Sequence, residues 1–81
     1  MELSVSYFAA AADFAGTRSE AISIPASCSV ATLRNLLEEG KPEQFGKLIR
    51  VCALMLNGQQ LHDGDEVSGG SLDVLPPFAG G

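Results

Sequence analysis

The sequence has few aromatic and few basic residues. It contains no tryptophan, one tyrosine and four phenylalanines, so its core must be built mainly from aliphatic side chains. Five lysines and arginines stand against ten aspartates and glutamates, which gives a net charge of −5. The basic residues are spread along the chain at Arg18, Arg34, Lys41, Lys47 and Arg50. A surface of this charge repels a phosphate backbone, and we therefore expect no nucleic-acid partner.

Long hydrophobic runs and clustered metal ligands are also lacking. No apolar stretch approaches the roughly 20 residues of a membrane-spanning helix, and the start, MELSV, lacks the basic residues of a signal peptide. We therefore expect a cytoplasmic protein without a membrane partner. One histidine and two distant cysteines are too few for a metal site. In the cytoplasm Cys28 and Cys52 are expected to stay free thiols, and their positions favour small core residues over a sulfur relay.

The remaining composition is that of one small packed domain of 81 residues, because 46% are hydrophobic and only 19% are charged. Apolar and polar residues alternate in residues 3–8, which predicts a strand with Leu3, Val5 and Tyr7 on one face. Helix formers in residues 9–15 predict one or two helical turns that end at Gly16. Alternation returns in residues 19–25, where we expect a second strand, antiparallel to the first.

The clearest helical pattern is SVATLRNLLEEG, residues 29–40. Ser29 suits an N-cap and Gly40 a left-handed stop. The apolar positions, which recur every three to four residues, are Val30, Leu33, Leu36 and Leu37. Residues 42–49 fit either a short helix or a loop, with Phe45 and Leu48 facing inward.

The second half of the chain predicts strands and turns. Residues 50–58 indicate a buried strand that ends in an Asn-Gly turn. A polar, turn-rich stretch follows, with Leu61 and Val67 as its large apolar anchors, and a lone His62 that we expect to be solvated and inert. Residues 72–77 predict a last short strand closed by prolines. One helix of about ten residues can cover only one face of a mixed sheet, so the fold class is α+β.

The chain finishes on LPPFAGG, a combination that suits neither helix nor strand. Pro76 and Pro77 stop the strand and fix φ near −65°, so the tail is directed away from the sheet. Gly80 and Gly81 have no Cβ and fit a narrow channel. Six residues from Pro76 span at most about 20 Å, enough to enter a buried active site. The alternative is a frayed end without a function.

Four stretches together resemble the small subunit of molybdopterin synthase: SYFAAAADFAG, VATLRNLLEE, LNG and, above all, LDVLPPFAGG. That family consists of ubiquitin-like sulfur carriers with the β-grasp fold. The resemblance implies a β-grasp domain over residues 1–75, with a mixed sheet and one main helix packed on one face. Residues 76–81 would form a flexible C-terminal tail.

The resemblance also implies a chemistry centred on Gly81. An activating enzyme related to ubiquitin-activating enzymes uses ATP to adenylate the Gly81 carboxylate, and a sulfur donor protein then converts it to a thiocarboxylate. The large subunit of molybdopterin synthase uses that sulfur to build the dithiolene of molybdopterin. The chain itself would bind no cofactor and no metal, since ATP acts in trans, and it would supply no catalytic acid or base.

An obligate partner requires an apolar patch near the start of the tail. The predicted partner-binding residues are Pro76, Pro77, Phe78, Ala79 and Gly80 in the tail, and Phe8 and Leu61 in the domain. Tyr7 is a further candidate, although core packing is an equally good interpretation of Tyr7 and Phe8.

Three other functions share these features. The sulfur carrier of thiamin thiazole synthesis has the same fold and glycine pair, but usually lacks the two prolines. A ubiquitin-like modifier shares the activation step and forms isopeptide bonds with lysines. A plain β-grasp interaction module would have no terminal chemistry, so its tail could be extended or trimmed without loss.

Overall fold

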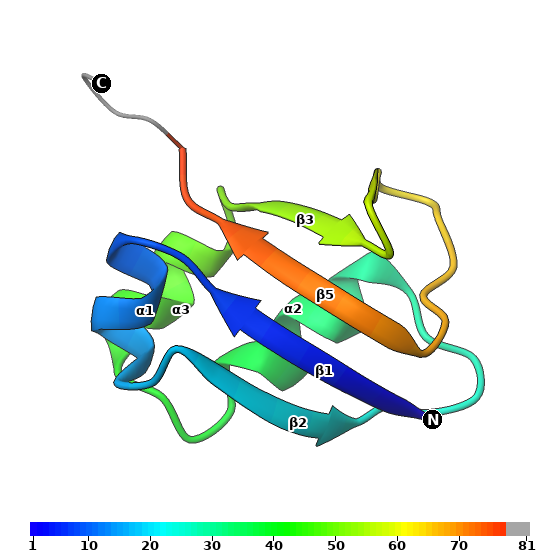
Figure 1. Cartoon of the computed structure of the whole chain (residues 1–81), viewed down its shortest axis with the longest axis horizontal. Helices are drawn as coiled ribbons and strands as arrows, with labels where there is room; N and C mark the ends of the chain where they lie inside the picture. The colour runs from blue at the N-terminus through cyan, green and yellow to red at the C-terminus, as the bar shows by residue number, and fades with distance from the viewer. Residues whose placement is uncertain (78–81) are drawn as a thin grey trace.

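The computed structural model describes residues 1–77, and these form a five-stranded sheet with three helices (Figure 1). The elements follow the order β1 (Glu2–Tyr7), α1 (Ala10–Ala15), β2 (Ser19–Ser23), α2 (Val30–Glu38), α3 (Glu43–Ile49), β3 (Ala53–Leu56), β4 (Gln59–Gln60) and β5 (Gly70–Leu75). In Figure 1, α2 lies behind the sheet, while α1 and α3 gather at the end where β5 finishes. Within the described residues, no helix has the length and apolar character needed to cross a membrane.

The sheet is mixed, with strand order β2-β1-β5-β3-β4. The two central strands, β1 and β5, run parallel, and every other pair is antiparallel. This arrangement confirms the predicted α+β class with a mixed sheet and its β-grasp topology. It also confirms the antiparallel pairing of the first two strands.

The core lies between the sheet and α2. Leu3, Val5 and Tyr7 are buried on one face of β1, as their alternation predicts. The other strands and the helices bury Leu54, Leu56, Leu72, Val74, Val30, Leu33, Leu37, Phe45 and Ile49. At about 25 cal/mol per Å² of apolar surface, burial of this aliphatic layer is the main stabilising contribution.

The helix boundaries follow the predicted capping residues. The Thr32 backbone N–H donates to Ser29 Oγ at 3.1 Å, which satisfies one free donor at the start of α2. Gly16, with a φ of 78°, is the left-handed C-cap that ends α1. In contrast, α2 ends at the extended residue Glu39, and Gly40, with a φ of 72°, lies in the next turn, which the Lys41 N–H closes on Glu38 O at 3.1 Å. Residues 9–15 and 29–40 were therefore predicted correctly, within a residue or two of the observed ends.

Two local predictions need correction. The ambiguous segment 42–49 is a helix, α3, and its inward residues are Phe45 and Ile49, whereas Leu48 is only partly buried. The continuous apolar run before the Asn-Gly turn is not one buried strand: β3 begins at Ala53, and Val51 is 61% exposed. Val51 is exposed because it lies in the turn that leaves α3, outside the sheet ladder.

The Asn-Gly turn holds the start of β5. Asn57 and Gly58 both have positive φ, as a two-residue hairpin turn requires. The Asn57 side chain accepts a hydrogen bond from the Ser71 N–H at 2.9 Å, and its backbone N–H donates to Ser71 O at 2.8 Å. A Cβ on Gly70, whose φ is 136°, would collide with the Asn57 side-chain amide. Glycine at position 70 is thus required by both its backbone angle and its neighbour.

We predict that Gly70→Ala lowers the free energy of unfolding by about 1–3 kcal/mol, the typical cost of a residue held at a disfavoured positive φ. Urea denaturation monitored by circular dichroism measures the change. Ser71→Ala, an exposed change one residue away, is the control and should cost less than about 0.5 kcal/mol. Equal stability of Gly70→Ala and wild type would contradict the conclusion that position 70 requires glycine.

Candidate functional site

The tail leaves the domain from the middle of the sheet. Leu75, the last residue of β5, pairs with Ala53 of β3, and the Phe8 N–H donates to Val74 O at 3.2 Å from the β1 side. Pro76 then ends the ladder, because proline has no N–H to donate. We call the segment Leu75–Pro77 the tail root. Its first residue, Leu75, is the last residue of β5 that is held between the neighbouring strands β1 and β3.

The described residues stop at the tail root. The predicted site residues Phe78, Ala79, Gly80 and Gly81 lie outside the part of the chain that the structure describes. Within the tail root, Pro76 is half-buried and Pro77 exposed. The predicted mobility of the tail therefore remains a prediction.

Exposed apolar side chains gather in the segments around the tail root. Phe8 is 44% exposed directly after β1, Phe14 is 39% exposed in α1, and Val51 is 61% exposed two residues before Ala53. The other large exposed apolar residue among those described, Met1, lies at the far end of β1 (Figure 1). We call Phe8, Phe14 and Val51 the apolar pole. These residues belong to segments at the end of the domain where β5 finishes (Figure 1), and exposed apolar side chains at one end of a domain are candidates for a protein–protein contact.

The other predicted contact residues of the domain lie differently. Tyr7 is only 4% exposed and packs in the core, so the core interpretation is correct for Tyr7, whereas Phe8 is accessible. Leu61 is partly buried against the core, and its N–H donates to Leu54 O at 2.8 Å. The structure therefore brings Phe8 to the tail root and places Leu61 beyond β3. Phe14 and Val51 were missed, because an apolar residue inside an apolar run carries no sequence signal of exposure.

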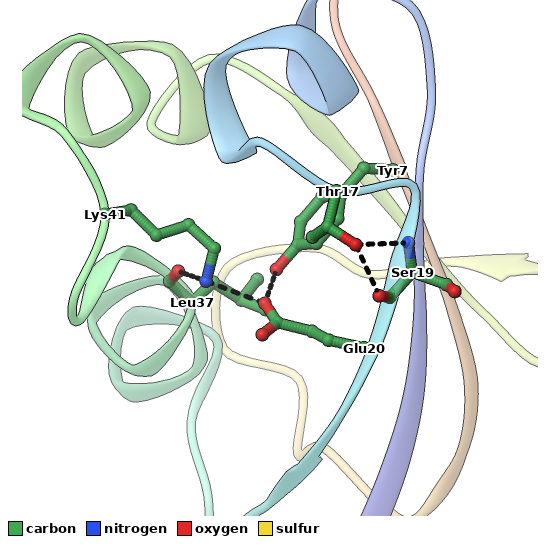
Figure 2. Close-up of polar contacts among 6 residues, drawn as sticks. All are labelled: Tyr7, Thr17, Ser19, Glu20, Leu37 and Lys41. Atoms are coloured by element: carbon green, nitrogen blue, oxygen red, sulfur yellow. Dashed lines mark hydrogen bonds and ion pairs between the residues drawn. The ribbon is translucent and has the colours of Figure 1, made fainter.

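The end of β1 is tied to the helices by a polar network around Glu20 (Figure 2). The Tyr7 hydroxyl donates to Glu20 Oε2, and Lys41 Nζ lies 2.6 Å from the same oxygen. Lys41 also donates to Leu37 O at 2.9 Å. Its ammonium group lies 5.7 Å from the ring centroid of Tyr7 and 5.4 Å from that of Phe45, within the range of cation–π attraction. The network joins β1, β2 and the α2–α3 connection.

The network shifts two pKa values in opposite directions. Burial raises the pKa of Tyr7 far above its usual value, and the hydrogen bond to Glu20 and its negative charge add to the effect. Burial also works to raise the pKa of Glu20, but hydrogen bonds from Lys41 and Tyr7 and the charge of Lys41 outweigh it, so that this pKa is lowered. At neutral pH Tyr7 is a donor and Glu20 a charged acceptor.

A second anchor lies on the other side of the tail root. The Arg34 guanidinium of α2 donates to Ile49 O and to Cys52 O, the latter at 3.0 Å. These carbonyls lie at the end of α3 and just before β3, where a cation also suits the helix dipole. Arg34 thereby positions Ala53, the partner of Leu75 in the sheet.

Neither cysteine is prepared for sulfur chemistry. Cys28 and Cys52 are both buried free thiols. Burial raises the pKa of both thiols, and for Cys52 the charge of Arg34 opposes the rise without cancelling it. Because the thiolate is the reactive form, this environment favours the core interpretation over a sulfur relay. Within residues 1–77, no three His, Cys, Asp or Glu side chains come together as a possible metal site.

Comparisons with known proteins agree with this architecture. The model of the ThiS family matches residues 5–81. The chain is 33% identical to the "Molybdopterin synthase sulfur carrier subunit" of Pyrenophora tritici-repentis, over 96% of this chain and 88% of that protein.

Solved structures share the fold. Small archaeal modifier protein 1 of Haloferax volcanii superposes with a TM-score of 0.79 at 19% identity, covering 95% of this chain and 98% of that one. One chain of the complex between subunits 1 and 2 of the molybdopterin-converting factor from Helicobacter pylori superposes with a TM-score of 0.67 at 24% identity, and the alignment covers 100% of both chains. Likeness at these identities shows the β-grasp fold alone.

The lowered pKa of Glu20 predicts a pH-dependent contribution to stability. A carboxyl group with a lowered folded-state pKa stabilises the fold above its unfolded pKa, about 4.3, and that contribution is lost as the pH falls through the folded value. We expect Glu20→Gln to lower the free energy of unfolding by about 1–3 kcal/mol at pH 7, because the neutral amide oxygen accepts more weakly than the carboxylate and cannot pair with the charge of Lys41. The gap between variant and wild type should narrow at pH 3.

Urea denaturation at both pH values measures this gap. Glu39→Gln is the matched control, because Glu39 is exposed and forms no ion pair within residues 1–77. An equal gap at pH 3 and pH 7 would show that the charge of Glu20 plays no part in the network.

Proposed function

The chain belongs to the ThiS family, and from this membership we propose that it is a sulfur carrier of molybdenum cofactor biosynthesis that acts through Gly81. The 33% identical relative is named a molybdopterin synthase sulfur carrier subunit. The observation that carries the proposal is the exit of the chain at the tail root. A central strand ends at two prolines, exposed apolar side chains lie in neighbouring segments, and only three residues separate Pro77 from Gly81.

The proposed chemistry takes place at the Gly81 carboxylate. A carboxylate is a poor acyl donor, so an activating enzyme first transfers AMP from ATP to one carboxylate oxygen and releases pyrophosphate. Hydrosulfide (HS⁻) released by a sulfur donor protein attacks the acyl carbon, the carbon–oxygen bond to AMP breaks, and the thiocarboxylate and AMP are the products. The chain supplies the acyl group and no acid, base or cofactor. Gly80 lets the backbone follow a narrow path to each active site.

The proposed acceptor is the large subunit of molybdopterin synthase. The related complex from Helicobacter pylori joins subunits 1 and 2 of the molybdopterin-converting factor. We propose that the apolar pole and the tail root contact such a subunit while residues 78–81 enter its active site. An interface of ordinary size buries about 800 Å² on each partner, so such a contact would extend beyond the tail root to the neighbouring segments.

A ubiquitin-like modifier is the second candidate, because small archaeal modifier protein 1 shares the fold. Both functions need an activated Gly81 carboxylate. They differ in the nucleophile that attacks the acyl carbon, which is sulfur for a carrier and a lysine amine for a modifier. Intact-mass spectra separate them: a carrier gains the mass of one oxygen-to-sulfur exchange, whereas a modifier appears joined to a second protein.

We predict that one residue added after Gly81 abolishes sulfur loading. The extension moves the carboxylate by about 3.5 Å, and a misplacement of 1 Å at a reacting centre already costs about 100-fold. The protein is incubated with ATP, its activating enzyme and a sulfur donor, and is then weighed intact. Wild type should gain the mass of one oxygen-to-sulfur exchange on its C-terminal peptide. Molybdopterin formation by the extended protein at the wild-type rate would refute the proposal.

We also predict that Phe8→Asp weakens binding to the large subunit by at least about tenfold, because the aspartate carboxylate would be desolvated in an apolar contact. Phe8 is 44% exposed and lies outside the buried core, so we expect the fold to be retained. Ala31→Asp adds the same charge on the exposed side of α2 and should bind like wild type. Calorimetric titration measures both. Wild-type affinity of Phe8→Asp would remove Phe8 from the interface.

A further inference from the structure

Most basic side chains of the chain have a partner within the fold. The Arg34 guanidinium is bound to backbone carbonyls, and Lys41 pairs with Glu20. The remaining pairs are Arg50 with Glu38 and, at 3.8 Å, Lys47 with Glu43. Arg18 differs: among residues 1–77 its side chain forms no ion pair and no hydrogen bond. Among residues 1–77, this leaves one guanidinium without a partner and able to bind another molecule.

Arg18 lies in the same row of the sheet as the tail root. The Tyr7 N–H donates to Arg18 O at 2.8 Å, and the next residue, Phe8, donates its N–H to Val74 O at 3.2 Å. The row therefore crosses from the start of β2 through β1 to β5. Two strand spacings, about 10 Å, separate the backbone of Arg18 from that of Val74. Arg18 is thus close to the tail root, although 56 positions in the sequence lie between Arg18 and Leu75.

Arg18 and Phe8 line one surface hollow. Its wall also includes Ser6, Ala9, Ala12 and Asp13. The hollow combines an exposed aromatic ring, small side chains that leave space, and a basic group. Asp13 is exposed and forms no ion pair with Arg18.

A partner that encloses the tail root must also cover this hollow. A standard footprint of about 800 Å² per partner has a radius of about 16 Å if it is roughly circular. Arg18, at about 10 Å, falls inside it. A guanidinium that loses its water and gains no acceptor is strongly destabilising. The partner is therefore expected to present an acceptor to Arg18, and a carboxylate matches the fork of donors best.

We infer that Arg18 and Phe8 form a two-part recognition site for the large subunit, which supplies a carboxylate to Arg18 beside an apolar side chain that packs on Phe8. This inference rests on the proposed function and adds the chemistry of the partner surface. The occupant is a folded protein surface, because the hollow is open and adjoins the apolar pole. In this site, Arg18 determines how the large subunit is oriented and which partner is accepted, and Phe8 contributes most of the apolar area that the contact buries.

The test compares charge changes at two exposed basic positions. Arg18→Ala and Arg18→Glu are titrated against the cognate large subunit by calorimetry at two salt concentrations, with Lys47→Glu as the matched control. The Lys47 side chain, in α3, is 78% exposed, and Lys47→Glu changes the net charge by the same amount as Arg18→Glu. We expect about tenfold weaker binding for Arg18→Ala, about 100-fold for Arg18→Glu, and less than threefold for Lys47→Glu. Added salt should weaken wild type more than Arg18→Ala.

A charge swap identifies the acceptor. Aspartates and glutamates on the surface of the large subunit are replaced singly by arginine and titrated against Arg18→Glu. Recovery of at least tenfold in affinity by one replacement supports the inference. Failure of every replacement, or equal weakening by Arg18→Glu and Lys47→Glu, overturns it.

Sulfur loading separates this inference from the proposed function. Arg18→Glu should acquire the thiocarboxylate from the activating enzyme and sulfur donor at the wild-type rate, as intact mass shows. If loading fails in wild type as well, the proposed function is wrong. If wild type loads and Arg18→Glu binds the large subunit normally, only the role of Arg18 is wrong. A loading defect specific to Arg18→Glu, with normal binding, assigns Arg18 to the activating enzyme and also overturns the inference.

Discussion

The parallel pairing of β1 with β5 is the constraint on which the rest of the structure depends. It joins the first strand to the last one and sets Leu3 opposite Gly70 and Tyr7 opposite Val74. Because opposite residues share a face, the buried side chains of both strands form one continuous apolar layer against α2. The same register brings Phe8 beside the tail root, so the packing of the core and the position of the proposed site have one cause.

Charged groups on the helix side of the sheet stabilise the surroundings of the tail root. Glu20 binds Tyr7 at the end of β1, and Arg34 binds carbonyls just before β3. These two strands flank β5, so both sides of the tail root are held from the helical layer. Each group has its hydrogen-bond partners, and no buried side-chain polar atom among the described residues lacks one. Satisfied polar groups of this kind favour one arrangement over near alternatives.

The proposed function assigns different consequences to mutations in different parts of the chain. Changes at Gly70 or Glu20 act on folding, since these residues determine strand register and the β1 anchor. Changes at Gly80 or Gly81 are expected to act on the proposed chemistry, because that chemistry takes place at the Gly81 carboxylate. Variants of Phe8 or Arg18 are expected to form a third class, in which binding to the proposed partner changes while folding and sulfur loading do not.

Much of the fold could be predicted from the residues themselves. Alternation in β1, the Ser29 cap and the Asn-Gly turn are local patterns, and each produced the element expected of it. The candidate chemistry at Gly81 came from the family resemblance, which the order of the proline and glycine pairs carries most specifically. Composition was enough to predict an aliphatic core.

Only the tertiary structure decided which side chains are available to a partner. Tyr7 and Phe8 are neighbours in one apolar run, yet one is buried in the core and the other is exposed. Lys41 and Arg18 are both isolated basic residues in the sequence, but Lys41 is held by Glu20, 21 positions away, whereas Arg18 has no such partner among residues 1–77. The physical reason is the range of the interactions. Helix caps and alternation act between residues a few positions apart, while strand pairing and ion pairs join residues that are distant in sequence and become neighbours only on folding.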